Sequence, residues 1–425
     1  MRFSTALVAL TLLTASALAQ NSSKVEPEPK SVTVPVTLDH NRVVIDVYVP
    51  LPDGSTKRVR GWVDTGDSDL ILSQRLAKTM GLTLICAGQV CGTPTPLPEI
   101  LIGGMKISLS GARPRIHEKP ENALSVAFPG MSAEIKIPST VLRNYDVLIN
   151  FPDREFSIGL PGSLKLNGVK SKMLVNASTG FIQIPSKIES KNYNLGLDIG
   201  SSISFLSEEL FDRLATANPG WPHMTGAVGP ANMGEAGDDE PKWKLMRVDR
   251  LQYGPLYLTD VAVAEFSKNF SAFFAKDAGV AIAGLIGTDA LMNYRIGLDY
   301  AHSTAYFDLG STFKFPDFDV VGLILRPEND TRFTILGVAD FDGRPSVPVG
   351  EDGVQAGDHL VAVDGIPVPD STMGQVWSLL EGTPGQERKL TVERDGKQVS
   401  VVAKVQHFLG EREENHSKEK SAEKK

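Results

Sequence analysis

The feature that most constrains the fold is a turn that occurs twice, an aspartate and a glycine one residue apart at the end of an apolar stretch. The first copy is Val63-Asp64-Thr65-Gly66 and the second is Leu197-Asp198-Ile199-Gly200. In each, an apolar strand runs into a carboxylate and the chain turns at a glycine, which needs no side-chain clearance. One such turn is a common polar strand end. Two such turns with the same surroundings predict a module that occurs twice in the chain.

The correspondence continues after the turns. At an offset of 198 − 64 = 134 residues, identical residues pair between the copies: Ser68 with Ser202, Leu72 with Leu206, Ser73 with Ser207 and Leu76 with Leu210. Each copy then enters a short helical pattern, at 74–80 and 208–215. The module is therefore predicted as strand, carboxylate turn, strand and helix, used twice.

A later stretch repeats as well. Residues 144–151 resemble 293–300, at an offset of 293 − 144 = 149. Just before it, the second copy carries Gly284-Leu285-Ile286-Gly287, whereas the first has Ile135-Lys136-Ile137-Pro138 in that place, without the glycine. Strand patterns separated by Gly and Pro turns fill both copies, so both are predicted to be rich in β structure.

With both motifs present, the chain resembles the bilobal aspartic proteases of the pepsin and retropepsin type over residues 30–312. The resemblance implies a mainly β, two-lobed acid-protease fold, with an N-terminal lobe at 30–160 and a C-terminal lobe at 161–312. Each lobe brings one aspartate to a shared site. Asp64 and Asp198 are then the catalytic residues, peptides or proteins are the substrates, and neither a metal nor another cofactor is needed.

The chemistry follows from two carboxylates that face each other. At about 3 Å apart they cannot both ionise readily, so they share one proton and their apparent pKa values separate. One acts as general base and removes a proton from a bound water, which attacks the peptide carbonyl. The other acts as general acid toward the developing oxyanion and the leaving nitrogen. The sequence does not assign these roles between Asp64 and Asp198.

The resemblance also implies six supporting residues around the two acids: Thr65, Gly66, Asp67, Ser68, Gly200 and Ser201. The glycines let backbone N–H groups approach the carboxylates. Thr65 resembles the family threonine whose hydroxyl ties one catalytic loop to the other, but the second motif has Ile199 there. Asp67 stands where pepsins have a serine. As an anion near Asp64 it would raise the apparent pKa of the pair, which predicts activity at milder pH than pepsin's.

The main alternative is a catalytically weak or inactive scaffold that binds peptides, in which the two turns have only a structural role. Glycosidases also use paired carboxylates, but repeated Asp-x-Gly turns in a β-rich, two-lobed chain do not fit their open sugar cleft. A flap over the site is expected in the hairpin around 100–109, which contains no tyrosine.

The first residues have the layout of a secretory signal peptide. One positive charge at Arg2 precedes a short apolar run at 6–15 and the small-x-small site Ala17-Leu18-Ala19, so residues 1–19 are expected to be removed on export to the periplasm or the medium. No later stretch approaches about 20 uninterrupted apolar residues, so stable membrane insertion is not expected. The net charge of −8 argues against non-specific nucleic-acid binding.

The chain has two cysteines, Cys86 and Cys91, separated by a short loop that contains Gly88. In an exported protein so close a pair favours a disulfide over free thiols. A metal site is a poor alternative, since no second cysteine pair and no nearby histidine complete four ligands.

A change in composition at 313–317 indicates a linker, followed by a separate unit at 318–407. Its residues 353–365 resemble a PDZ domain. The resemblance implies that Val321-Gly322-Leu323-Ile324 bind the C-terminal carboxylate of a peptide or protein ligand, which adds to the sheet as an extra strand. A structural cap on the protease is the alternative. The charged residues 408–425 are predicted to form a disordered tail.

Overall fold

The computed structural model describes residues 28–88, 90–117, 130–233, 237–279, 281–310, 318–328, 331–341 and 345–410, and the single positions 124, 127, 128 and 343. The predicted signal peptide and residues 411–425 of the predicted tail lie outside this part of the chain. Phe408 and Leu409, at the predicted start of the tail, are fully buried. The folded part therefore extends at least to Leu409.

The N-terminal lobe is built on a 10-stranded sheet, in which β3, β4, β5, β10 and β11 form the centre. It also contains the first strands of a sheet that both lobes share. Its elements are β1 (Ser31–Pro35), β2 (Thr37–Asp39), β3 (Arg42–Pro50), β4 (Thr56–Val63), β5 (Asp69–Ser73), α1 (Gln74–Thr79), β6 (Ile85–Ala87), β7 (Val90–Gly92), β8 (Ile100–Ile102), β9 (Met105–Ile107), β10 (Arg113–His117), β11 (Ala133–Ile137), α2 (Ser139–Leu142), β12 (Asp146–Asn150) and β13 (Glu155–Gly159).

The C-terminal lobe is built on an 8-stranded sheet and carries the long hairpin β20–β21. Its elements are β14 (Val169–Lys172), β15 (Leu174–Val175), β16 (Ile182–Ile188), β17 (Lys191–Leu197), β18 (Ser204–Ser207), α3 (Glu208–Ala217), β19 (His223–Thr225), the 3-10 helices η2 (Gly229–Ala231) and η3 (Gly237–Lys242), β20 (Lys244–Tyr253), β21 (Leu256–Phe266), α4 (Lys268–Ala278), β22 (Gly284–Ile286), α5 (Thr288–Leu291), β23 (Tyr294–Asp299) and β24 (Thr304–Leu309).

The two lobes repeat one topology. In the first, β11 runs parallel to β4 and antiparallel to β5, and β10 runs parallel to β5. In the second, β22 runs parallel to β17 and antiparallel to β18, and β21 runs parallel to β18. A third, 6-stranded sheet joins the lobes through the antiparallel pair β12–β23. The duplicated module is therefore present as two structural repeats.

The residues that match between the repeats explain part of this likeness. Ser73 and Ser207 are the N-caps of α1 and α3, and their hydroxyls accept hydrogen bonds from the backbone N–H groups of Leu76 and Leu210. Such caps satisfy N–H groups that the first turn of a helix leaves without a partner. Leu76 and Leu210 are also buried in the core. The repeated Ser-x-x-Leu pattern thus begins each helix and anchors it to its sheet.

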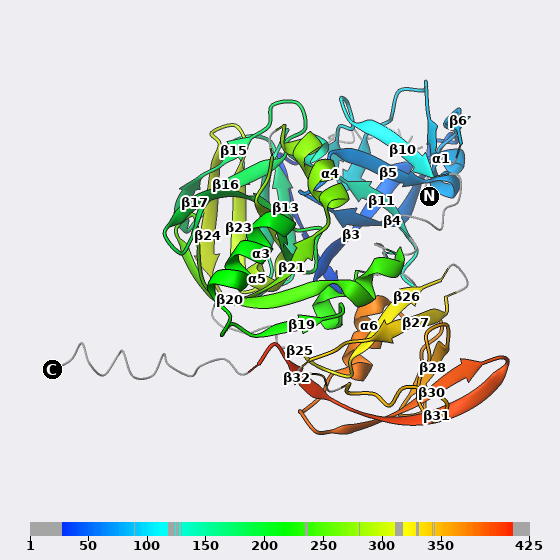
Figure 1. Cartoon of the computed structure of the whole chain (residues 1–425). Helices are drawn as coiled ribbons and strands as arrows, with labels where there is room; N and C mark the ends of the chain where they lie inside the picture. Colours follow the sequence, from blue (N-terminus) through cyan, green and yellow to red (C-terminus); the bar gives the residue numbers. More distant parts are fainter. Residues whose placement is uncertain are drawn as a thin grey trace, which may run out of the picture.

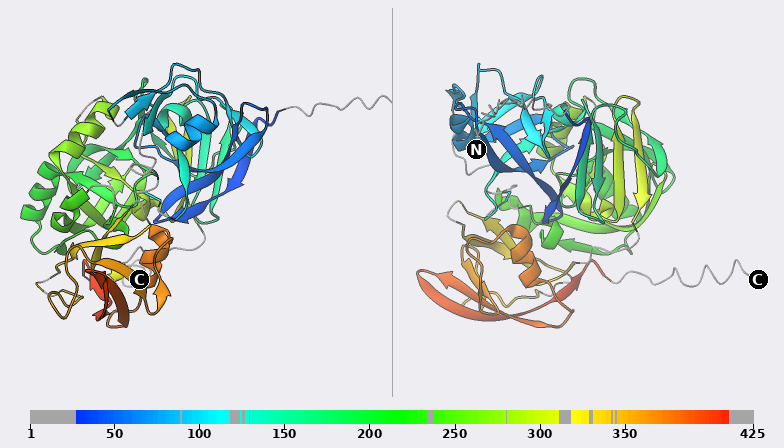
Figure 2. Two further views of the ribbon diagram at one scale, coloured as in Figure 1. Left: turned by 90° about the vertical axis from the view of Figure 1, so that its right-hand side faces the viewer. Right: turned by 180° about the vertical axis from the view of Figure 1, so that it is seen from behind.

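Residues after 317 form a small domain with one main sheet, ordered β26-β27-β28-β30-β31, and one helix. Three views place it against one end of the two lobes (Figures 1 and 2). Its elements are β25 (Phe318–Val320), β26 (Leu323–Pro327), β27 (Phe333–Val338), β28 (His359–Val363), β29 (Ile366–Pro367), α6 (Met373–Leu380), β30 (Glu387–Arg394), β31 (Lys397–Lys404) and β32 (Gln406–Phe408).

The small domain shares a hydrophobic core with the C-terminal lobe. One cluster of buried side chains contains Met224, Val228 and Ala231 of the lobe together with Leu323 and Trp377 of the small domain. A continuous apolar contact of this kind favours a fixed arrangement over free domain motion. The predicted mainly β fold, two lobes followed by a small domain, is confirmed.

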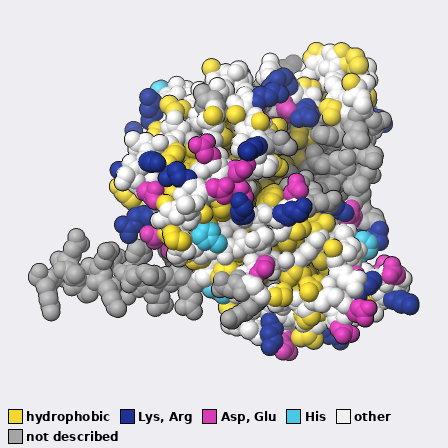
Figure 3. Space-filling view, viewed as in Figure 1, with side chains coloured by type: hydrophobic (Ala, Val, Ile, Leu, Met, Phe, Trp, Pro, Cys, Tyr) yellow, Lys and Arg dark blue, Asp and Glu magenta, His cyan; other side chains and the backbone are white. Residues whose placement is uncertain are grey.

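Two surface properties bear on partners. Acidic and basic side chains are interspersed over the face shown in Figure 3, so the described residues there form no broad patch of one charge. Within the described part of the chain, no helix combines the length and apolar character needed to cross a bilayer.

Candidate active site

The two Asp-x-Gly turns occupy equivalent places in the two lobes. Asp64 follows β4 and its backbone N–H donates to the carbonyl of Ile137, at 3.0 Å. Asp198 follows β17 and its N–H donates to the carbonyl of Ile286, also at 3.0 Å. Each aspartate is therefore fixed by the strand that lies parallel to its own, and each is only 5% exposed.

The carboxylates are oriented by backbone donors of their own loops. Asp64 Oδ1 accepts from the N–H of Gly66 at 2.8 Å, and Asp198 Oδ1 accepts from those of Gly200 and Ser201 at 2.9 and 3.1 Å. A Cβ atom built on Gly66 would lie 2.3 Å from the Asp198 carboxyl carbon, and one built on Gly200 would lie 2.5 Å from that of Asp64. Each carboxyl thus lies against the opposite loop, and the glycines provide the clearance.

Thr65 ties the loops together. Its hydroxyl donates to the carbonyl of Leu197 at 2.7 Å and accepts from the N–H of Ile199 at 3.1 Å. Ile199 is fully buried in the symmetric position and has no hydroxyl to return these bonds. The hydroxyl that connects the two Asp-x-Gly loops therefore comes from one lobe only.

A Thr65→Val variant is expected to lose about 1 to 3 kcal/mol of unfolding free energy, because two buried backbone groups lose a shared partner. Thr65→Ser, which keeps the hydroxyl, is the matched control and should stay close to the unchanged chain. Urea unfolding followed by tryptophan fluorescence measures both. Equal stability of the valine and serine variants would contradict a structural role for this hydroxyl.

Lys136 lies beside Asp64, a position that the sequence analysis did not assign to the site. Its Nζ is 3.6 Å from Asp64 Oδ2 and forms an ion pair with Asp67, and its side chain is 2% exposed. The ammonium also lies 5.6 Å from the centre of the Trp62 ring. A signal was available, because at the offset 285 − 136 = 149 Lys136 corresponds to Leu285, which lines the same cavity.

Burial and charge shift the pKa values of both acids upward. Burial raises the pKa of Asp64 to about 6, since the opposing Lys136 cation cancels only part of the effect, and the anion of Asp67 adds to the rise. Burial, followed by the negative charge of Asp64, raises the pKa of Asp198 well above its ordinary value. The effect predicted for Asp67 has the expected direction, but its ion pair with Lys136 was not foreseen.

The remaining predicted support residues have other partners. Asp67 Oδ1 accepts from the N–H of Asp69 at 2.8 Å. Ser68 donates to Asp277 through both its N–H and its hydroxyl, each at 2.9 Å. The Ser201 hydroxyl donates to the carbonyl of Ile203 at 2.8 Å, so Ser201 contacts Asp198 through its backbone.

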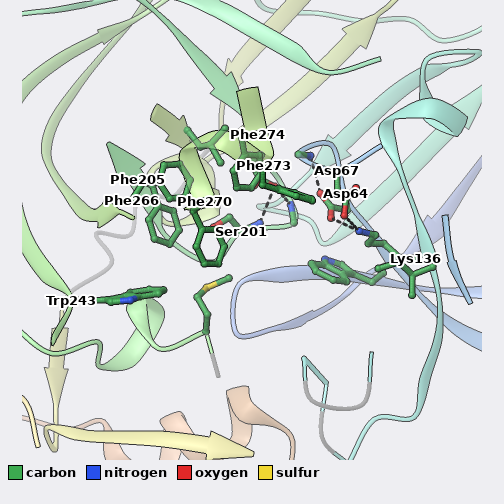
Figure 4. A pocket seen from close by; sticks show the side chains of 17 residues that line it. Asp64, Asp67, Lys136, Ser201, Phe205, Trp243, Phe266, Phe270, Phe273 and Phe274 are labelled. Carbon is green, nitrogen blue, oxygen red and sulfur yellow. Dashed lines mark hydrogen bonds and ion pairs between the residues drawn. The ribbon is translucent and has the colours of Figure 1, made fainter. Parts of the chain in front are cut away.

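A cavity of about 420 Å³ opens in front of the two acids. Asp64, Asp67 and Lys136 lie on one side of it, and an aromatic wall from the C-terminal lobe lies on the other (Figure 4). We call the following residues the aromatic wall: Phe205, Trp243, Phe266, Phe270, Phe273 and Phe274. Burying aromatic surface is strongly favourable, so this wall suits a large apolar side chain.

Helix α4 closes one side of the cavity and reaches the other lobe. Its Phe270, Phe273 and Phe274 belong to the aromatic wall. Near its C-terminal end, Asp277 accepts the two hydrogen bonds from Ser68 of the first Asp-x-Gly loop. The Thr179 hydroxyl donates to the backbone carbonyl of Asp277 at 2.6 Å. The helix therefore bridges the two lobes beside the two buried aspartates.

An Asp277→Ala variant is expected to lose about 1.5 to 3 kcal/mol of unfolding free energy, because the hydrogen bonds from Ser68 to a charged acceptor on α4 are lost. Asp212→Ala in α3 is the matched control, since that exposed carboxylate has a surface ion pair with Lys244. Urea unfolding of the two variants is compared. An equal free energy of unfolding for the two variants would show that α4 stays in place without this contact.

The hairpin expected to form a flap lies elsewhere. Strands β8 and β9 add to the outer edge of β3, and the turn between them packs against β1, where Gly103 contacts Val32 and Val34. No residue of 100–109 lines the described cavity. The expectation of a flap there is wrong, because the hairpin extends the sheet instead of covering the acids.

Cys86 and Cys91 form a disulfide in the small hairpin β6–β7, at the edge of the N-terminal sheet. Neither residue lines the cavity. The disulfide therefore closes a local loop outside the candidate active site.

The four residues predicted to bind a peptide carboxylate are buried. Val321 N–H donates to the carbonyl of Leu380 at 3.0 Å, Gly322 N–H to the hydroxyl of Ser346 at 2.7 Å, and Leu323 N–H to the carbonyl of Val321 at 2.8 Å. Val321, Leu323 and Ile324 are fully buried. In this conformation the backbone donors of three of the four residues already have partners within the chain, so their role in ligand binding stays a prediction.

Comparison with known proteins gives two findings. Residues 323–405 match the family model described as "PDZ domain". A solved structure titled as the crystal structure of aspartic proteinase from Irpex lacteus is 14% identical to this chain. The match covers 66% of this chain and 98% of that one, with a TM-score of 0.39. No curated protein matches the chain. The chain thus contains a PDZ domain at residues 323–405.

Proposed function

We propose that the chain is an aspartic endopeptidase in which Asp64 and Asp198 activate one water molecule. The observation that carries the proposal is the mutual fit of the two turns, in which each carboxyl lies against the glycine of the opposite loop. Two buried acids whose charges interact share a proton, which provides a base and an acid in one site. The pattern at 1–19 supports export as part of the same proposal.

The charges around the pair favour one assignment of roles. Lys136 lies 3.6 Å from Asp64 Oδ2 and favours the carboxylate form of Asp64. That negative charge favours the protonated form of Asp198. Asp64 then acts as general base toward water, and Asp198 donates a hydrogen bond to the carbonyl oxygen of the substrate. After attack, the proton taken from water reaches the leaving nitrogen, the C–N bond breaks and a carboxylic acid and an amine are released.

The aromatic wall supports a preference for peptides with a large apolar residue next to the scissile bond. The proposal is tested by incubating the chain with a peptide library between acidic and neutral pH, with mass spectrometry to locate cleavage, and with a statine-type inhibitor in parallel. Cleavage beside apolar residues that the inhibitor abolishes is expected. Peptide binding without cleavage would leave the chain as a non-catalytic peptide-binding scaffold.

A further inference from the structure

A segment of the C-terminal lobe lies against the edge strand of the PDZ sheet. Strand β26 is the terminal strand of that sheet and pairs on one side with β27. PDZ domains bind peptides by adding them as a strand to an exposed sheet edge. Here the N–H of Leu325 donates to Oδ1 of Asn232, from the C-terminal lobe, at 3.0 Å. An edge donor suited to an external ligand therefore has an internal partner.

Asn232 ends a segment of the C-terminal lobe, residues 225–232, that contacts the PDZ domain at both ends and that we call the inserted segment. At its start, Thr225 and Asp340 exchange two backbone hydrogen bonds of 2.9 and 2.8 Å. Val228 is fully buried within the core that the lobe shares with β26 and α6. At its end, Asn232 is fully buried and its carbonyl is 2.6 Å from Nε2 of His40. The inserted segment thus holds its place through both backbone and apolar contacts.

The same segment adjoins the wall of the cavity in front of the acids. Met233, the next residue, lines that cavity, and so does Trp243. The N–H of Gly226 donates to the carbonyl of Trp243 at 2.8 Å. The Trp243 ring makes an edge contact with Phe205, with centres 5.6 Å apart. Any displacement of the inserted segment would therefore move this side of the cavity.

We propose that residues 225–232 are an intramolecular occupant of the PDZ peptide site, and that a peptide with a free C-terminal carboxylate displaces them and shifts the cavity wall at Met233 and Trp243. The last side chain of that peptide is apolar, because Ala227, Val228 and Ala231 of the inserted segment belong to the same buried apolar cluster as Leu323 and Trp377. Displacement of the inserted segment by a peptide does not depend on the proposed protease activity. The expected effect of that displacement on cleavage rests on the proposed protease activity.

A reversible lock tests the binding step. Thr225→Cys with Asp340→Cys places two cysteines at a directly opposed antiparallel pair, where Cα atoms are about 5.5 Å apart, a distance that a disulfide spans. The lock is made in an Asp64→Asn chain, so that the probe is not cleaved. The probes are fluorescein-labelled ten-residue peptides that end in Val, Leu, Ile or Phe with a free carboxylate, and their C-terminally amidated copies.

The free-carboxylate peptides are expected to bind the reduced double-cysteine chain at least tenfold more tightly than the oxidised one. The Asp64→Asn chain without the added cysteines is the control and should bind equally with and without reductant, since its own disulfide lies in the β6–β7 hairpin. Equal affinity in the locked and unlocked states overturns the proposal. Absence of peptide binding in both states also overturns it.

The effect on the cavity is measured with the double-cysteine chain that keeps Asp64. In its reduced state, a binding peptide with a D-amino-acid backbone upstream of its last four residues is expected to change the KM for a reporter substrate at least threefold, and in the oxidised state to change nothing. An unchanged KM in both states overturns the coupling. A chain that cleaves no reporter contradicts the protease function, whereas the binding experiment still decides the displacement.

Discussion

An Asp198→Asn variant is expected to cleave peptides about 10³- to 10⁴-fold more slowly than the unchanged chain, because general acid catalysis by a positioned side chain contributes up to about 10⁴-fold. Asparagine keeps the size of the side chain and accepts the same backbone hydrogen bonds from Gly200 and Ser201. Its amide carries no acidic proton that can pass to the oxygen of the developing oxyanion. The rate constant kcat on a peptide identified in the library experiment measures the loss.

Stability should change in the opposite direction from activity. The pKa of Asp198 is raised in the folded chain, so the folded state holds the proton more tightly than the unfolded state. The free energy of unfolding therefore falls as the pH rises above the ordinary value of 3.8 for this group. A neutral asparagine removes this penalty. The Tm of Asp198→Asn at pH 7 is expected to be equal to or higher than that of the unchanged chain.

Asp249→Asn is the control for this pair of measurements, since Asp249 is an exposed aspartate on β20 of the same lobe. It should change neither kcat nor Tm. Undiminished cleavage by a folded Asp198→Asn chain would remove Asp198 from the mechanism. A lower Tm together with lost activity would indicate a structural role instead.

The two lobes and their paired aspartates could be predicted from the sequence, because the repeated residues act on their immediate neighbours in the chain. Asp64 and Asp198 end apolar strands, and Ser73 and Ser207 cap the helices that follow. Local rules of this kind depend on a few neighbouring residues. They therefore predict the module and its duplication without knowledge of the rest of the fold.

Contacts between distant segments were harder to predict. Ser68 and Ser202 are identical in the repeat, but Ser68 bonds to Asp277 of α4, whereas Ser202 bonds to the backbone of His40. The place of Asn232 against β26 depends on how the PDZ domain packs against the lobe. Lys136 was missed as well, although the 149-residue offset places it opposite Leu285.

A Lys136→Met variant is expected to move the acid limb of the kcat/KM against pH profile upward by about one pH unit or more, a change that corresponds to about 1.4 kcal/mol per unit. The ammonium lies 3.6 Å from Asp64 Oδ2 and lowers the pKa of that carboxyl. Without it, burial and the negative charge of Asp67 raise the pKa of Asp64 with no opposition from the Lys136 charge. Asp64 then ionises only at higher pH, so cleavage near pH 5 falls most.

The same variant should lose about 3 to 5 kcal/mol of unfolding free energy, because removal of one partner leaves the largely buried Asp67 as an uncompensated charge. Lys136→Met combined with Asp67→Asn removes that charge, so stability should recover while the acid limb stays above its original position. Lys57→Met is the control, since Lys57 lies in the same lobe and is more exposed.

The double variant matters most because it separates the electrostatic role of Lys136 from its structural one. If it is stable and its acid limb matches that of the unchanged chain, Lys136 does not set the ionisation of Asp64, and the assignment of Asp64 as base has no support from charge.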